Sequence, residues 1–134
     1  MREEHPHLVL VRRLWEAGAR GDADAVSDCY APGAVLRAYG APGSPMAGEF
    51  KGTAEILDYL ARAGEIVDDS SSEALECYAS DAGAVIRYRT VATRGGKHLD
   101  MQYLYVLAID EGRIVRAEVV PTDQRRNDEF WRSQ

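Results

Sequence analysis

Residues 84–120 read AVIRYRTVATRGGKHLDMQYLYVLAIDEGRIVRAEVV, and this stretch decides the fold. Runs rich in β-branched and aromatic residues at 84–93, 98–109 and 113–120 are separated by short turns that contain glycine. Such runs predict strands joined by hairpins. A fourth run at 73–79 precedes them, so the sequence predicts a four-stranded antiparallel meander.

The first turn within this stretch is a hairpin whose central pair is the Gly-Gly at 95–96. Two-residue turns favour glycine because both central positions must adopt a positive φ. The turn places Tyr88 opposite Tyr103 and Ile86 opposite Tyr105. The aromatic side chains are therefore predicted to share one face of the sheet.

The second turn, residues 110–112, allows two registers, and a shift of one residue moves every side chain to the other face. A two-residue turn sets Leu107 opposite Arg116 and places charges on the apolar face. A three-residue loop with Gly112 in the left-handed conformation sets Leu107 opposite Val115. We predict the three-residue loop because it keeps the charges off that face. The same loop gives two further pairs, Tyr105 with Ala117 and Tyr103 with Val119.

The predicted register divides the meander into two faces. The apolar and aromatic face should receive the helices, and it carries Ile86, Tyr88, Met101, Tyr103, Tyr105, Leu107, Val115, Ala117 and Val119. The other face mixes apolar and charged residues, namely Arg87, Arg89, Gln102, Leu104, Val106, Arg116, Glu118 and Val120. This outer face is too mixed for a core and too apolar for full solvation, so we expect a homodimer that forms through it.

The start of the chain is predicted to be helical. Apolar residues at helical spacing indicate a helix from about residue 7 to Arg20, which Gly21 ends. Asp22 is a suitable N-cap for a second, shorter helix that runs to Tyr30. The two helices are expected to meet at one tight corner.

The middle of the chain is predicted to alternate between short elements and loops. A short strand is expected at 34–39, and residues 40–48, with two prolines and three glycines, predict a loop. Thr53 is expected to cap a third helix, which Gly64 closes. A polar linker is predicted at 68–72.

The bulk composition limits the class of protein. At 134 residues, 46% hydrophobic and 28% charged, the chain predicts one α+β domain over 1–134, with residues 1–7 as a tail. The formal net charge is −6 and the basic residues are scattered, so we expect no nucleic-acid partner. No signal peptide or membrane-spanning run is recognisable, and Cys29 and Cys77 are expected to be reduced and buried. These features predict a cytoplasmic protein.

The order of predicted elements and several short motifs resemble those of the SnoaL-like family. The motifs are GDADAV at 21–26, YAPGAV at 30–35, GTAEI at 52–56, DEGRIV at 110–115 and the closing segment 123–131. The resemblance spans roughly Leu8 to Trp131. It is specific for the fold and carries little information about chemistry.

The resemblance implies a cystatin-like cone, in which a curved antiparallel sheet wraps around three N-terminal helices and encloses a ligand cavity. The wider superfamily includes nuclear-transport-factor-like and ketosteroid-isomerase-like proteins. The positions of the steroid isomerases' base, oxyanion-stabilising tyrosine and proton-donating aspartate correspond to Ala38, Leu14 and Tyr105 here. The acidic residue and the histidine of the polyketide cyclases correspond to Val119 and Ala117. Only Tyr105 can still donate a hydrogen bond.

The candidate catalytic residues are Asp123 and Tyr105. The predicted register puts Asp123 on the cavity face, where partial burial would raise the pKa of its carboxyl and suit it to proton transfer. The alternative is that Asp123 ends a strand and caps the following segment. Candidate substrate-binding residues, for which core packing is the alternative role, are Trp15, Tyr30, Tyr39, Tyr88, Met101, Tyr103 and Val119.

No metal-ligand spacing, phosphate-binding loop, dinucleotide fingerprint or nucleophile elbow is present in the sequence. We therefore expect no metal and no cofactor. The leading hypothesis is that the cone binds a small, largely apolar metabolite and isomerises, cyclises or dehydrates it by acid/base chemistry. The alternative hypothesis is a non-catalytic module that dimerises or senses a ligand.

Overall fold

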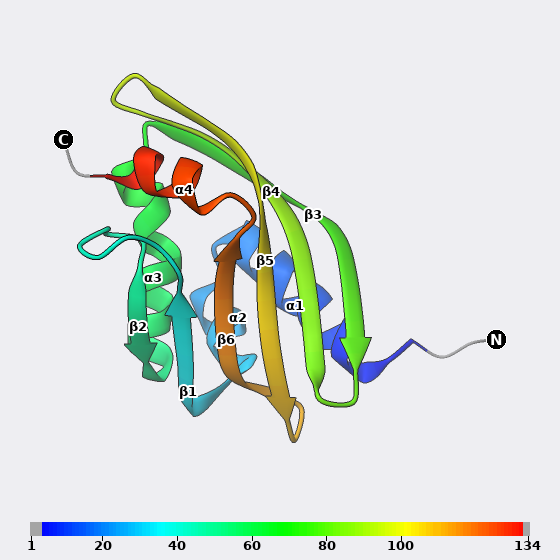
Figure 1. Cartoon of the computed structure of the whole chain (residues 1–134). Coiled ribbons are helices and arrows are strands. Elements are labelled where there is room, and N and C mark those ends of the chain that lie inside the picture. The colour runs from blue at the N-terminus through cyan, green and yellow to red at the C-terminus, as the bar shows by residue number, and fades with distance from the viewer. Residues whose placement is uncertain (1–3, 133–134) are drawn as a thin grey trace.

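The computed structural model describes residues 4–132 and shows an α+β fold in which one curved six-stranded sheet covers the helices (Figure 1). The helices are α1 (Pro6–Arg20), α2 (Ala23–Asp28), α3 (Gly52–Ile66) and α4 (Gln124–Trp131). The strands are β1 (Tyr30–Ala38), β2 (Gly48–Lys51), β3 (Asp69–Ser80), β4 (Gly83–Arg94), β5 (Lys97–Asp110) and β6 (Arg113–Pro121). Their order in the sheet is β2-β1-β6-β5-β4-β3. No helix within this range is long and apolar enough to cross a membrane.

Strands β3 to β6 form the predicted meander, and the hairpin between β4 and β5 has the predicted register. Tyr88 pairs with Tyr103, and Ile86 pairs with Tyr105. These side chains face the helices, where Ile86 is fully buried. The opposite, outer face carries no helix, as the front of the sheet in Figure 1 shows.

The predicted three-residue loop between β5 and β6 is wrong. Glu111 and Gly112 both adopt positive φ, 50° and 76°, and they close a two-residue turn. The register then shifts on β6 at Val115, which lies between the paired residues Ile114 and Arg116 and is 37% exposed.

This β-bulge adds one residue to β6. The two-residue turn alone would put the apolar residues of β6 on the outer face, and the extra residue returns those after Val115 to the helix-facing side. Leu107 therefore pairs with Ala117 and Tyr105 pairs with Val119. Ala117 and Val119 face the helices, as predicted, although their pairing partners are not the predicted ones. Val115, which was expected on the same face, is exposed.

The strand β2 was not predicted, and its residues lie partly in the expected loop. It pairs antiparallel with β1, which begins at Tyr30 rather than at residue 34. β1 in turn lies parallel to β6, with Leu36 opposite Ala117. The sheet is therefore antiparallel except for this one pair.

Three local predictions also need correction. The residues predicted as a linker begin β3, which starts at Asp69. Thr53 does not cap α3; instead the carboxylate of Glu55 accepts the backbone N–H of Lys51 at 2.9 Å. The helix also continues past Gly64 to Ile66.

The N-terminal segment that the structure describes is not a tail. The side chain of His5 caps α1 by accepting the backbone N–H of His7 at 3.1 Å. The His7 ring lies 2.8 Å from the carbonyl oxygen of Ser80, so the start of α1 is attached to the turn between β3 and β4. Residues 1–3, the remainder of the predicted tail, lie outside the described residues.

Candidate functional site

A cavity of about 570 Å³ lies between the helix-facing side of the sheet and the helices α1, α2 and α3. Its wall is mainly apolar, with side chains that include Leu14, Trp15, Val26, Met46, Leu57, Ile86 and Val119. A cavity of this size and lining is typical of small-molecule sites. No Asp, Glu, Lys, Arg, His or Cys is among the lining residues that the structure describes.

Five tyrosines from four elements converge on the cavity, and we call them the tyrosine cluster: Tyr30, Tyr59, Tyr88, Tyr103 and Tyr105. Strand alternation explains three of them, because Tyr88, Tyr103 and Tyr105 occupy helix-facing positions of β4 and β5. The Tyr88 and Tyr103 rings stack with centroids 5.4 Å apart. Trp15, from α1, packs on Tyr88 at 5.5 Å.

The hydroxyl of Tyr103 is held by two residues of α4. It donates to Asn127 Oδ1 at 2.6 Å, and it lies 3.5 Å from Trp131 Nε1, which donates to it. Because an indole N–H can only donate, the Tyr103 proton remains available for the Asn127 carbonyl. This network fixes α4 against the sheet.

The other four hydroxyls of the cluster differ in their partners. Tyr30 and Tyr105 are hydrogen-bonded to each other, and one proton of this pair is not used in that bond. The hydroxyls of Tyr59 and Tyr88 make no hydrogen bond to any residue that the structure describes. These two hydroxyls are available to a ligand.

Burial keeps the tyrosine cluster neutral. Loss of solvation raises the pKa of Tyr103 to about 12, and it raises the pKa of every other member as well. At neutral pH these phenols therefore donate hydrogen bonds and do not act as bases.

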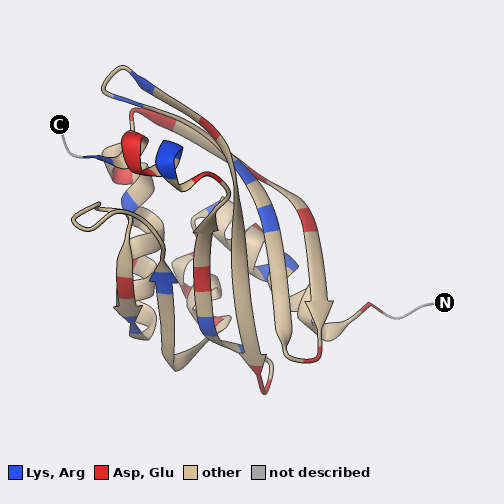
Figure 2. Ribbon diagram, in the orientation of Figure 1, with Lys and Arg blue, Asp and Glu red and all other residues tan. Residues whose placement is uncertain are grey.

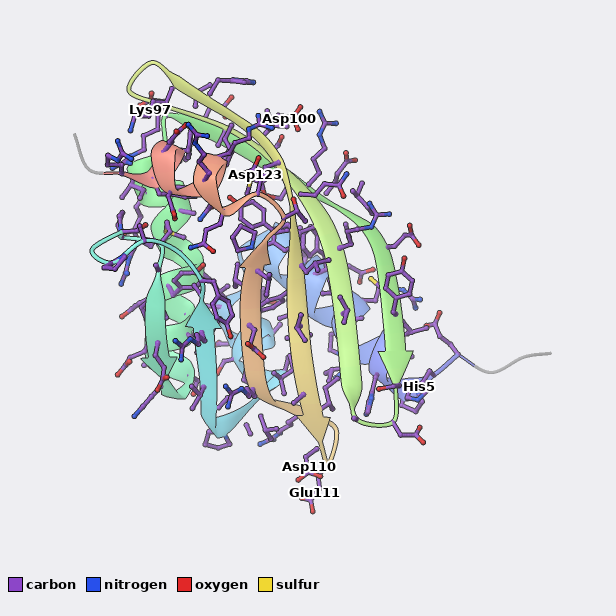
Figure 3. All side chains as sticks on the ribbon, viewed as in Figure 1. His5, Lys97, Asp100, Asp110, Glu111 and Asp123 are labelled. Atoms are coloured by element: carbon purple, nitrogen blue, oxygen red, sulfur yellow. The ribbon has the colours of Figure 1, made fainter. Side chains whose placement is uncertain are left out.

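Asp123 is not on the cavity face, so its predicted position is wrong. It is exposed and is the N-cap of α4, where Oδ1 accepts the backbone N–H of Arg126 at 3.1 Å (Figure 3). The shift at Val115 does not change which face the later residues of β6 occupy, but the strand ends at Pro121, opposite Tyr103, so Asp123 lies beyond the sheet at the start of α4. The capping alternative describes this residue.

Most of the other predicted residues lie together. Tyr105 and the predicted binding residues Trp15, Tyr30, Tyr39, Tyr88, Tyr103 and Val119 all line the cavity. Met101 does not; it is buried in the core beside Thr90 on the neighbouring strand. Tyr39 is 36% exposed, and its hydroxyl donates to Glu118 on the outer face.

The predicted burial of the two cysteines holds for Cys29 only. Cys29 is fully buried, and burial raises the pKa of its thiol. Cys77 is exposed on the edge strand β3, and both thiols are free.

No group of three or more potential metal-ligating side chains occurs within residues 4–132.

Sequence reasoning missed Tyr59, Asn127 and Trp131 as cavity residues. Tyr59 lies three residues after Ile56 and was within reach of the helical spacing that identified α3. Asn127 and Trp131 lie in a segment for which no helix was predicted, so no periodicity linked them to the sheet.

Comparison with known proteins shows the same fold and family. A family model described as a SnoaL-like domain matches residues 11–117. An uncharacterised protein of Mycobacterium tuberculosis is 32% identical over 127 residues, which cover 92% of this chain and 95% of that protein.

Two solved structures have related sequences. Bal32a, from a soil-derived mobile gene cassette, is 29% identical with a TM-score of 0.86, covering 95% of this chain and 97% of that one. A putative polyketide cyclase from Sinorhizobium meliloti is 26% identical with a TM-score of 0.66, and the match covers 82% of this chain and 92% of that one.

Proposed function

This chain belongs to the SnoaL-like domain family, and we propose that its cavity binds a small, neutral and largely apolar metabolite through hydrogen bonds from the tyrosine cluster. The observation that carries this proposal is a 570 Å³ cavity in which the hydroxyls of Tyr59 and Tyr88 have no partner among the described residues. Burying a charged ligand there would cost free energy, because no charged side chain is among the described residues that line the wall.

The chemistry that the tyrosine cluster supports is polarisation of a ligand oxygen. A phenol that donates to a carbonyl withdraws electron density and stabilises negative charge that develops on that oxygen. The likeness to a putative polyketide cyclase makes isomerisation, cyclisation or dehydration the reactions to test. A proton acceptor for such a reaction would have to come from the ligand or from water, because residues 4–132 supply no carboxylate or imidazole to the cavity wall.

Binding without turnover is the second candidate function, and it is favoured because no carboxylate or imidazole lines the cavity in the described part of the chain. In that case the tyrosine cluster would select a ligand without transforming it.

The two cysteines of the protein, Cys29 and Cys77, are both free. Free thiols are typical of proteins in a reducing compartment, so we propose that the protein works in the cytoplasm.

The proposal is tested with two near-isosteric probes, 4-acetylbiphenyl and biphenyl-4-carboxylate, by isothermal titration calorimetry. The neutral ketone should bind at least about tenfold more tightly than the carboxylate, because the described cavity wall has no positively charged side chain to pair with the anion. Tyr88→Phe should weaken ketone binding by about threefold to tenfold, the usual effect of one hydrogen bond.

A control variant is Tyr78→Phe, since Tyr78 is 53% exposed, donates to Glu76 and does not line the cavity. This change should leave ketone binding unaltered. Absence of ketone binding, or equal binding of the ketone and the carboxylate, would contradict the proposed function. Both tryptophans of the chain line the cavity, so quenching of their fluorescence reports entry of the probe.

A further inference from the structure

Three hydroxyl side chains form a polar strip on the cavity wall, away from the tyrosine cluster. Ser70 and Ser72 come from β3, and Thr90 comes from β4. Ser72 pairs with Thr90 across the two strands, and their hydroxyl oxygens are 2.8 Å apart. Ser70 lies opposite Ala92, one step further along the same wall.

The strip continues the row of side chains that begins inside the cavity. Alternate residues of β4, from Ile86 through Tyr88 and Thr90 to Ala92, all line the cavity. Successive members of such a row are about 7 Å apart along the strand. The hydroxyls of the strip therefore lie about 7 to 13 Å further along the wall than Tyr88.

Exposure shows which side of the cavity wall meets the solvent. Ile86 is fully buried, and Tyr105, opposite it, is 7% exposed. Ser70 and Ser72 are exposed on the edge strand β3, whereas Ala92, at the end of the β4 row, is 2% exposed. The strip thus lies on the outer side of the cavity, along the exposed strand β3, whereas four of the five residues of the tyrosine cluster are buried.

We propose that Ser70, Ser72 and Thr90 form an outer subsite that binds a second ligand oxygen. The ligand class is then an elongated, neutral, largely apolar molecule with one oxygen held by the tyrosine cluster and another at the opposite end. This inference rests on the proposed function of the cavity. Each hydroxyl can donate and accept, so the outer oxygen can belong to a hydroxyl or a carbonyl group.

The test compares 4-acetylbiphenyl with 4-acetyl-4′-hydroxybiphenyl, which differs only by a hydroxyl at the far end. The wild-type protein should bind the hydroxylated probe about threefold to tenfold more tightly, as one or two added hydrogen bonds would give. The double variant Ser72→Ala/Thr90→Val should lose this preference and bind the two probes with equal affinity. Both partners of one hydrogen bond are removed together, so neither is left unpaired.

Ser71→Ala is the matched control. Ser71 is on the same strand and pairs with Val91, and neither residue lines the cavity. This variant should keep the full preference for the hydroxylated probe.

The outcomes separate this inference from the proposed function. If 4-acetylbiphenyl binds and Tyr88→Phe weakens it, but the added hydroxyl gives no preference, the outer subsite is wrong and the binding function stands. A preference that survives in Ser72→Ala/Thr90→Val also overturns the subsite. If neither neutral probe binds the wild type, both proposals fail.

Discussion

The tyrosines that line this cavity have different roles, and the hydrogen bonds of their hydroxyls distinguish those roles. Tyr103 joins Asn127 and Trp131 in a buried network. Tyr59 is 5% exposed, and its hydroxyl has no partner within residues 4–132. One tyrosine therefore stabilises the fold through its hydroxyl, and the other presents its hydroxyl to the cavity.

Removing these two hydroxyls should have unequal effects on stability. Tyr103→Phe leaves a carbonyl and an indole N–H unpaired in the interior, and should lower the free energy of unfolding by about 1 to 3 kcal/mol. Tyr59→Phe loses no protein partner and should change it by less than about 0.5 kcal/mol. Urea denaturation of both variants checks this. Equal losses would mean that Tyr103 does not hold α4.

The raised pKa values predict that stability falls at alkaline pH. Unfolded tyrosines release their protons near pH 10, whereas the buried phenols keep theirs, with the pKa of Tyr103 at about 12. The unfolded state then binds fewer protons than the native state, so the free energy of unfolding decreases as pH rises above about 10. Below that pH the full contribution is present.

Denaturation midpoints measured from about pH 8 to pH 11 check the alkaline prediction. Tyr59→Phe removes one buried phenol whose pKa is raised, so it should make the decline with pH shallower. A decline equally steep in this variant would show that Tyr59 is not protected from ionisation.

At the scale of elements, the β4–β5 hairpin depends on a close approach at its base. Gly83, the first residue of β4, pairs with Ala108, and a Cβ atom at this position would lie 1.9 Å from the backbone oxygen of Leu107. Backbone cannot yield as a flexible side chain can. Only glycine fits here without moving the strands apart.

Gly83→Ala should lower the free energy of unfolding by about 3 kcal/mol, because the added methyl group forces the strands apart. Gly64→Ala is the matched control, since it lies in α3 with nothing within 4 Å of the new Cβ atom. It should raise stability by about 0.5 to 1 kcal/mol, since alanine favours a helix over glycine. Thermal or urea unfolding distinguishes the two. A neutral Gly83→Ala would show that the hairpin can relax at this point.

At the scale of the whole molecule, the outer face of the sheet remains without a helix (Figure 1), and charges of both signs are interspersed over the fold (Figure 2). Ion pairs such as Arg87 with Glu76 and Arg89 with Asp100 occupy part of the outer face. Leu104 and Val106 lie on β5, next to β6, and form an apolar strip on this face. Both side chains are only partly buried. We propose that a second copy of the chain covers this apolar strip.

The homodimer proposal predicts a dimeric mass by size-exclusion chromatography with light scattering. Val106→Glu should convert the dimer to a monomer, because it places an unpaired charge in the interface. Val9→Glu is the control, since Val9 is 41% exposed on α1 and lies away from the sheet face. A wild-type monomer, or a Val106→Glu variant that stays dimeric, would refute this interface.

The sequence by itself determined the meander, the faces of β4 and β5, and the convergence of Tyr88, Tyr103 and Tyr105. These properties follow from alternation along a strand and from the Gly-Gly turn at 95–96, so they are local. Membership of the family could also be recognised from short motifs between Leu8 and Trp131.

The tertiary structure alone decided which polar groups share the cavity. The end of β6 at Pro121 and the start of α4 placed Asp123 outside the expected site, and the packing of α4 brought Asn127 into the cavity wall. The parallel pairing of β1 with β6 joins residues that are about eighty positions apart. Contacts between such distant residues depend on how whole elements pack, and no local pattern in the sequence specifies them.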